Sequence, residues 1–204
     1  MQYKSTSFYG LIILFFLFFS CNSNKKNELP NQNTRTQQIE QLKAAKNPSV
    51  YNALRDTILS YPNDSLKNAL ISDISYHFYS KNDSIKFRYW NSYSFKISEE
   101  RENISGIAEA NWDLGNFFYR QNNIDSSYYH YNLAYEEYLE ARDEIKAGRM
   151  LLNMAILQEY IKDYVGSENT TFKALDLFEE STQAEKYIYR ANNNLGIIYN
   201  GLEN

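Results

Sequence analysis

The chain has 204 residues and a formal net charge of −4, so its charge gives no electrostatic attraction to nucleic acid, and we expect no nucleic-acid partner. Its single cysteine excludes an internal disulfide. Only 7 glycines and 3 prolines occur, against 19 tyrosines. Because Gly and Pro both disfavour helix interiors, this composition favours an all-α fold of stacked helices.

The amino terminus has the pattern of a secretory signal. Lys4 precedes an apolar run from Phe8 to Phe19, and Ser20-Cys21 and a polar stretch follow. A charged start, a short apolar core and a small residue before the cleavage site are typical of a signal peptide. We interpret residues 1–20 as resembling a bacterial lipoprotein signal, in which Cys21 becomes the first mature residue and carries the lipid. This places the protein in the cell envelope, anchored on the periplasmic side of a bacterial membrane.

Two alternatives to lipidation remain open. One is an uncleaved transmembrane anchor, but the 12 residues from Phe8 to Phe19 extend only ~18 Å as a helix, against ~30 Å of hydrocarbon. The other is a cleaved signal that leaves Cys21 as a free thiol.

Residues 21–35 are predominantly polar and are predicted to form a flexible tether. Residues 36–65 follow as two predicted helices, Thr36–Lys46 and Ser49–Ser60, separated by Asn47-Pro48. Neither helix has a repeat signature. We expect this pair to cap the end of a helical array, with Asp64 or Ser65 starting the next helix.

From residue 66 to residue 204 the sequence repeats itself. Pairs of one apolar and one small residue recur 40, 40 and 41 residues apart, namely Ile74-Ser75, Leu114-Gly115, Met154-Ala155 and Leu195-Gly196. A fixed spacing of this size is the mark of a solenoid of stacked units, which favours a binding scaffold over an enzyme. The expected units are 68–107, 108–147, 148–188 and an incomplete unit at 189–204.

The order of residues within a unit resembles the tetratricopeptide repeat (TPR). In the best copy Leu114-Gly115 leads through Asn122-Asn123 and Ser127 to Tyr131 and Ala134, and the next copy keeps that order. The resemblance implies a right-handed solenoid of antiparallel helix pairs. Its small residues would let helices approach closely, with Asn122-Asn123 as the turn. The spacing exceeds the usual 34 residues, so either the helices or the connections are longer. The first copy diverges, with Phe87 where the second has Ser127.

The resemblance also implies where a ligand would bind, because the first helix of each TPR unit lines the concave surface. The candidate groove residues are Glu109, Trp112, Asn116, Tyr119 and Arg120 in one unit and Arg149, Leu152, Ile156, Glu159 and Tyr160 in the next. Aromatic rings would offer flat apolar area, and arginines would hold a carboxylate or carbonyl of a bound peptide. The alternatives are packing of Trp112 between units and an ion pair between Arg120 and Asp125.

The last unit has one predicted helix, with apolar residues from Ala191 to Leu202, and then the chain stops. We expect a front part of a longer protein, an interrupted gene product or a domain completed by a partner; the alternative is a final helix that frays beyond Gly201. The chain resembles the exported TPR region of lipoproteins, sensor kinases and regulators of Bacteroidota, so a sensor fragment for signal transduction is the second functional hypothesis.

No catalytic, metal or cofactor pattern occurs. His77 and His130 have no His-Glu-x-x-His arrangement, and the glycines form no phosphate-binding loop. Adjacent acidic pairs such as Glu136-Glu137 diverge around a helix and do not converge on a substrate. An envelope enzyme therefore has no positive support. The sequence favours a non-enzymatic scaffold, bound to the membrane by its lipid, whose ligand is a protein or peptide.

Overall fold

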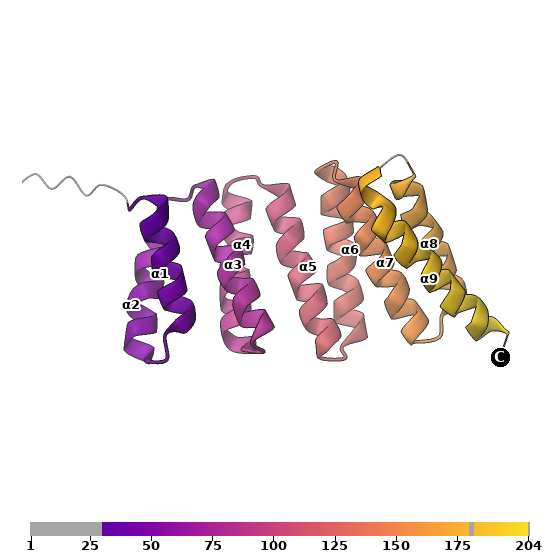
Figure 1. Cartoon of the computed structure of the whole chain (residues 1–204), viewed down its shortest axis with the longest axis horizontal. Coiled ribbons are helices and arrows are strands. Elements are labelled where there is room, and N and C mark those ends of the chain that lie inside the picture. The colour runs from indigo at the N-terminus through magenta and orange to yellow at the C-terminus, as the bar shows by residue number, and fades with distance from the viewer. Residues whose placement is uncertain (1–29, 180–181, 204) are drawn as a thin grey trace, which may run out of the picture.

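The computed structural model describes residues 30–179 and 182–203, and these residues are entirely helical apart from their connections (Figure 1). The expected signal, Cys21 and most of the expected tether lie outside the described residues. The described helices are α1 (Gln32–Ala44), α2 (Pro48–Leu59), α3 (Ser65–Ser80), α4 (Ser84–Glu100), α5 (Ile104–Arg120), α6 (Ile124–Glu140), α7 (Glu144–Tyr160), α8 (Tyr164–Phe178), the short 3₁₀ helix η1 (Thr182–Ala184) and α9 (Glu185–Leu202).

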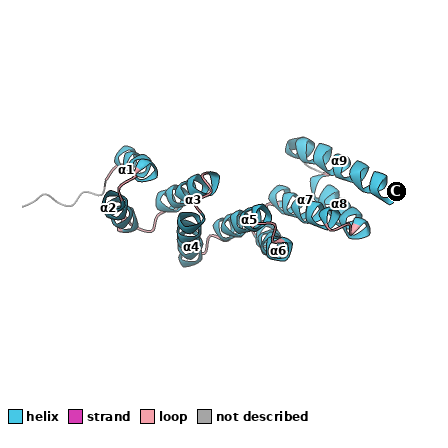
Figure 2. Cartoon of the chain, turned by 90° about the horizontal axis from the view of Figure 1, so that it is seen from below, coloured by secondary structure: helices cyan, strands magenta, loops and turns pink. Residues whose placement is uncertain are grey.

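The helices form two layers. Figure 2 shows the odd-numbered helices in one row and the even-numbered helices in the other, and the row of odd-numbered helices lies on the inner side of a gentle bend. We call the helices α1, α3, α5, α7 and α9 the inner layer and the helices α2, α4, α6 and α8 the outer layer. The helices pack side by side as the antiparallel pairs α1–α2, α3–α4, α5–α6 and α7–α8, and α1 packs on α3 to join the first two pairs. The expected all-α architecture is therefore confirmed for the described residues.

The turns between α3 and α8 repeat every 20 residues. Each turn contains one non-glycine residue with positive φ, at Asn82, Glu102, Asn122, Arg142 and Lys162. In the first turn Asp83 N–H donates to the carbonyl of Phe78 and Asn82 N–H to that of Tyr79, which is the Schellman motif, and the Asp83 side chain then caps α4. Helices α4 to α7 are each 17 residues long. Two helices of 17 residues and two connections of 3 residues therefore make up the 40-residue spacing.

Small residues let the paired helices approach closely, as the sequence predicted. A Cβ on Gly115 would lie 2.4 Å from Cδ1 of Tyr131. Across the same contact Ser127 donates its hydroxyl to the carbonyl of Gly115 at 2.9 Å, and 40 residues later Ser167 donates to the carbonyl of Ala155 at 2.7 Å. This repeated hydrogen bond fixes the register of α6 on α5 and of α8 on α7.

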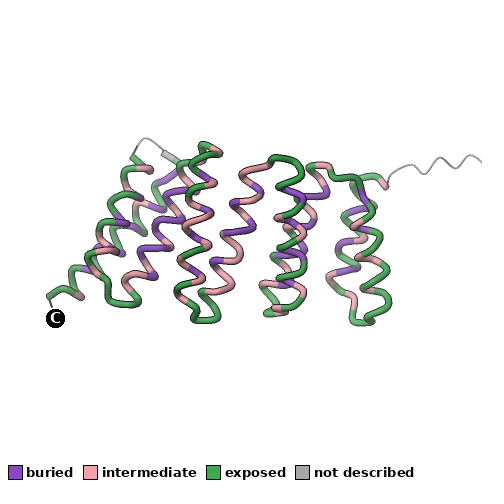
Figure 3. Tube along the Cα trace, turned by 180° about the vertical axis from the view of Figure 1, so that it is seen from behind, coloured by how far each residue is buried: buried purple, intermediate pink, exposed green. Residues whose placement is uncertain are grey.

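The pair of α3 and α4 fills the same place differently. Phe87 is fully buried where Ser127 stands in the next pair, and the buried hydroxyl of Ser75 has no hydrogen-bond partner. A ring has thus replaced the hydroxyl that would bond across the helix contact. The largest fully buried side chains of the described residues are Trp90, Tyr138, Phe87 and Phe178, and buried segments line the contacts between the layers (Figure 3).

Two boundary predictions were wrong. The helix α1 begins at Gln32, so residues 32–35 of the expected tether are helical, because Asn31 caps the helix and Arg35 is buried. The expected unit starts at 108 and 148 lie inside α5 and α7. The residues that begin these helices are the caps Asn103 and Asp143, and the small-residue pairs used to place the units lie in mid-helix.

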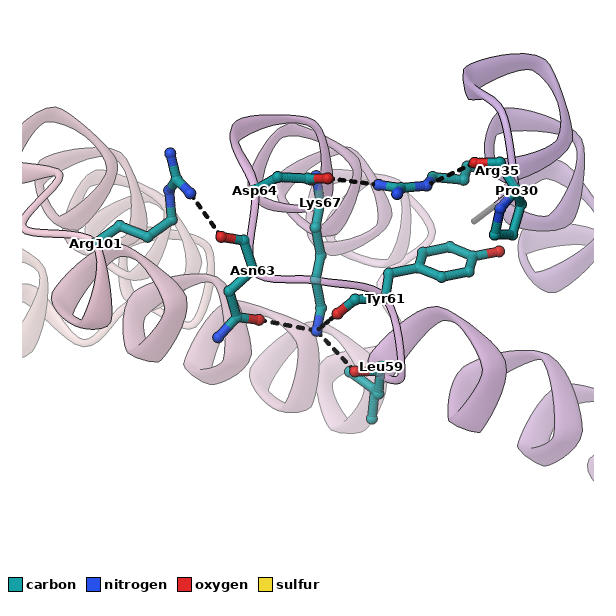
Figure 4. A network of polar contacts seen from close by, with 8 residues as sticks. All are labelled: Pro30, Arg35, Leu59, Tyr61, Asn63, Asp64, Lys67 and Arg101. Atoms are coloured by element: carbon teal, nitrogen blue, oxygen red, sulfur yellow. Dashed lines mark hydrogen bonds and ion pairs between the residues drawn. The ribbon is translucent and has the colours of Figure 1, made fainter. Parts of the chain in front are cut away.

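Buried cations join the first helix pair to the array (Figure 4). Lys67 is 3% exposed, and its Nζ donates to the carbonyls of Leu59 at 2.7 Å and Tyr61 at 2.8 Å and to Oδ1 of Asn63 at 3.0 Å. Arg35 donates to Asp64, the N-cap of α3, at 2.9 Å. The connection between α2 and α3 is therefore held by charged hydrogen bonds rather than by apolar packing alone.

Candidate binding groove

The inner layer holds a groove between α7 and α9. A cavity of about 260 Å³ is lined by three of the predicted groove residues, Leu152, Ile156 and Glu159, and by five residues of α9: Tyr189, Arg190, Asn193, Asn194 and Ile197. On α7 the residues 152, 156 and 159 share one helix face because they are four and three apart. The lining of the cavity is therefore mixed, with apolar and polar side chains from both helices.

The α9 side of the groove was missed by the sequence interpretation, although a signal for it exists. The step from Ala155 to Gly196 is 41 residues, and the same step carries Leu152 to Asn193 and Ile156 to Ile197. Applying the repeat spacing to the last helix would therefore have named both. They were omitted because α9 was regarded as the incomplete end of the array.

Trp112 and Arg149 come together, but in packing rather than as an open ligand platform. The Arg149 guanidinium lies 4.3 Å from the Trp112 ring centre and 5.0 Å from that of Tyr187. Trp112 packs against the buried cluster of α5 to α9. Arg149 thus links α5, α7 and α9 by cation–π contacts along the inner layer. The alternative of Trp112 packing between units is the one that the structure supports.

Arg120 and Tyr160 also bind within the chain. Arg120 donates to the carbonyl of Tyr79 at 3.0 Å and to Oδ1 of Asn82. The Tyr160 hydroxyl donates to Oδ1 of Asn122 at 3.1 Å. Each therefore bonds the left-handed turn residue of the preceding helix pair, and the ion pair considered between Arg120 and Asp125 does not form. Both residues join neighbouring pairs at one edge of the inner layer.

Of the remaining candidate groove residues, two have partners within the chain and one is exposed. Asn116 accepts a hydrogen bond from the Tyr131 hydroxyl at 2.8 Å and so orients that ring over Gly115. Glu109 pairs with Lys146 at 3.1 Å. Tyr119 is 45% exposed on α5. Among the predicted groove residues, Leu152, Ile156 and Glu159 of α7 thus line a cavity, whereas most of the α5 stripe contacts other parts of the chain.

Asp113 is a further acidic group of α5 that the sequence interpretation did not single out. Burial, with a smaller contribution from the charge of Glu109, raises its pKa from 3.8 to about 7. No ion pair joins Asp113 to a basic side chain within residues 30–179 and 182–203. The folded protein therefore holds a proton on this carboxyl that the unfolded chain loses near pH 4.

Because the pKa of Asp113 is raised in the folded protein, we expect the free energy of unfolding to decrease as the pH rises from about 4 to about 7. In this window the unfolded chain ionises Asp113 while the folded chain keeps the proton, so raising the pH favours unfolding, and the effect levels off above pH 7. We expect Asp113→Asn to stabilise the protein by about 2 kcal/mol at pH 8 and to have little effect at pH 4, allowing for partial solvent exposure. Urea unfolding across this range, with Asp176→Asn on the exposed surface as control, measures both. An unchanged pH dependence in Asp113→Asn would contradict the assignment.

Neither a metal site nor a membrane-spanning helix is found in the described part of the chain. No group of three or more His, Cys, Asp or Glu side chains there could hold a metal ion. None of the helices described above is long and apolar enough to cross a bilayer.

Comparison with known proteins supports the fold. A solved structure, the crystal structure of BtubC (BKLC) from P. vanneervenii, matches with a TM-score of 0.64 over 84% of this chain and 70% of that chain, at 15% sequence identity. At this identity the likeness shows the fold alone. No protein-family model matches the chain, and no curated protein matches it significantly.

Proposed function

We propose that the chain is a non-enzymatic scaffold that binds an extended protein or peptide segment along the inner layer, with its main contacts at α7 and α9. The observation that carries this is the groove cavity, which has Leu152, Ile156 and Ile197 as apolar lining and Glu159, Arg190 and Asn193 as polar lining. Ligand sites commonly combine an apolar lining with a few polar groups that fix the orientation of the ligand. A peptide fits this arrangement if one of its apolar side chains contacts the apolar lining and its backbone forms hydrogen bonds with the polar lining.

The TPR resemblance is part of the same proposal. Helix pairs in two layers, a 40-residue spacing and small residues at the helix contacts support it. We extend the proposal to an exported protein held at the periplasmic side of a membrane through lipidated Cys21. The basis for that extension is the signal pattern of residues 1–20 alone.

Selection of a random peptide library on the full-length protein tests the proposal. We expect enriched peptides with a shared apolar position, whose affinity falls at least tenfold in Ile197→Asp because the new carboxylate enters the cavity. Ile197 is 46% exposed, so the fold should tolerate the change. The matched control is Val165→Asp on the outer layer, where Val165 is 62% exposed. A library that yields no specific peptide, or equal losses in both variants, would overturn the proposal.

A further inference from the structure

A second and larger cavity lies among α4, α5 and α6. It measures about 580 Å³, within the usual range for small-molecule sites, and is formed by the outer-layer helices α4 and α6 with α5 between them. Its apolar lining consists of Phe95, Leu114, Leu133 and the Tyr129 ring, and its polar lining of Arg88, Asn91, Ser92, Asn111, His130 and Glu137. None of these residues lines the groove of the inner layer.

A polar chain of three side chains is fixed at one end of this cavity. Asn111 is 3% exposed, and its Nδ2 donates to both carboxylate oxygens of Glu137, at 2.9 and 3.0 Å. The Asn111 amide therefore turns its Oδ1 toward His130, whose Nδ1 lies 3.1 Å away. Since Oδ1 can only accept, His130 Nδ1 carries the proton and Nε2 is left as an acceptor. The His130 ring is further held by stacking on Phe118, with ring centres 5.3 Å apart.

The carboxylate of Glu137 has no cationic partner among the described residues. No ion pair joins it to a Lys or Arg there, and Asn111 is the only side chain that donates to it. Burial raises the pKa of Glu137, and the nearby Glu136 and Glu140 raise it further. Arg88 lines the same cavity, but no ion pair between its guanidinium and Glu137 is found in the described part of the chain. A partly buried negative charge is thus left for a ligand to neutralise.

Three of the polar side chains that line the cavity offer acceptor atoms. They are the Glu137 oxygens, Nε2 of His130, which burial keeps neutral by lowering its pKa, and Oδ1 of Asn91, whose Nδ2 already donates to the carbonyl of Ala110 at 3.1 Å. An ammonium group supplies three donors and one positive charge, which match this set. The rings of Phe95 and Tyr129 and the side chains of Leu114 and Leu133 suit an apolar body beside the cation.

We infer that the cavity between α4 and α6 binds a small organic molecule that carries a primary ammonium group on an apolar body, with the ammonium at Glu137 and the apolar part against Phe95, Leu114 and Leu133. This site is separate from the peptide groove, because it is lined by α4, α5 and α6 and shares no lining residue with the cavity between α7 and α9. The protein would then hold a small ligand and a peptide at separate places.

Three probes that share the 2-phenylethyl group separate charge from apolar contact: 2-phenylethylammonium, the neutral 2-phenylethanol and the anionic 3-phenylpropionate. The chain contains two histidines, His77 and His130, so histidine ring resonances in NMR spectra report the place of binding. We expect saturable shifts of the His130 ring with the ammonium probe, at least tenfold weaker binding of the alcohol, and no binding of the anion. The His77 resonances should stay unchanged, because His77 does not line the cavity.

Glu137→Gln keeps the size of the side chain and removes its charge. We expect this substitution to weaken binding of the ammonium probe about tenfold and to leave binding of the alcohol unchanged. Glu136→Gln, on the neighbouring exposed position, is the matched control and should bind as the unaltered chain does. Thermal unfolding of both variants checks the fold. The inference is overturned if the ammonium probe leaves His130 unmoved, if alcohol and ammonium bind alike, or if Glu137→Gln and Glu136→Gln behave equally.

Discussion

Replacing Gly115 by alanine is expected to destabilise the protein by about 2 kcal/mol, although alanine is the better helix former. The added Cβ would lie 2.4 Å from Cδ1 and 2.5 Å from Cε1 of Tyr131, and neither atom is the end of a flexible chain. Tyr131 cannot turn away without losing its hydrogen bond to Asn116. Overpacking of this kind costs about 1–3 kcal/mol, more than the ~1 kcal/mol that alanine gains over glycine within a helix. Chemical denaturation of the two proteins measures the difference.

Gly196 provides the matched control, since it holds the equivalent place in α9 and a Cβ added there would have no atom within 4 Å. At this position only the helix preference operates, so Gly196→Ala should stabilise by about 1 kcal/mol. The two substitutions are therefore expected to act in opposite directions. Equal effects would show that the small residues are not required for close helix contact.

Replacing Lys67 by methionine should cost about 3 kcal/mol. The side chain is 3% exposed, and its ammonium group satisfies two backbone carbonyls and Asn63 where α2 passes into α3. Methionine keeps the apolar stem but leaves these acceptors without a donor, and hydrogen bonds to a charged group contribute about 1.5–3 kcal/mol. We expect the loss to appear as a lower free energy of unfolding and as earlier proteolysis near Asn63.

The control for Lys67 is Lys96→Met on α4. Lys96 has a side chain that is 64% exposed and lies 3.8 Å from Glu100, an arrangement worth well under about 1 kcal/mol. Its replacement should leave the unfolding free energy nearly unchanged. If Lys67→Met were equally mild, the connection between α2 and α3 would be held by apolar packing and not by the buried ammonium.

The sequence predicted those parts of the fold that rest on local rules. Asp64 caps α3 as expected, and Asn122-Asn123 forms the expected turn, because capping and left-handed turns depend on neighbouring residues. The start of α1 was missed although Asn31 caps it locally, and the burial of Arg35 that supports it depends on contacts distant in sequence. Arg35 reaches Asp64, 29 residues away, and its guanidinium lies 4.9 Å from the ring centre of Tyr61.

The candidate site was predictable in position but not in detail. Helical spacing places Leu152, Ile156 and Glu159 on one face, and the structure brings them to one cavity. Spacing cannot show that Arg120 reaches back to Tyr79, or that Arg149 lies between two rings, since both depend on how one helix pair leans on the next. The cavity around Glu137 needed the same information, because its lining comes from three helices.

The most direct test of peptide binding by the inner layer is site-specific photo-crosslinking with a peptide selected on the full-length protein. A photoreactive residue replaces Asn193, which lines the groove on α9, or Lys173, which is exposed on α8 of the outer layer. We expect a covalent adduct between the peptide and position 193 and none with position 173. An adduct from position 173 without one from position 193 would contradict it.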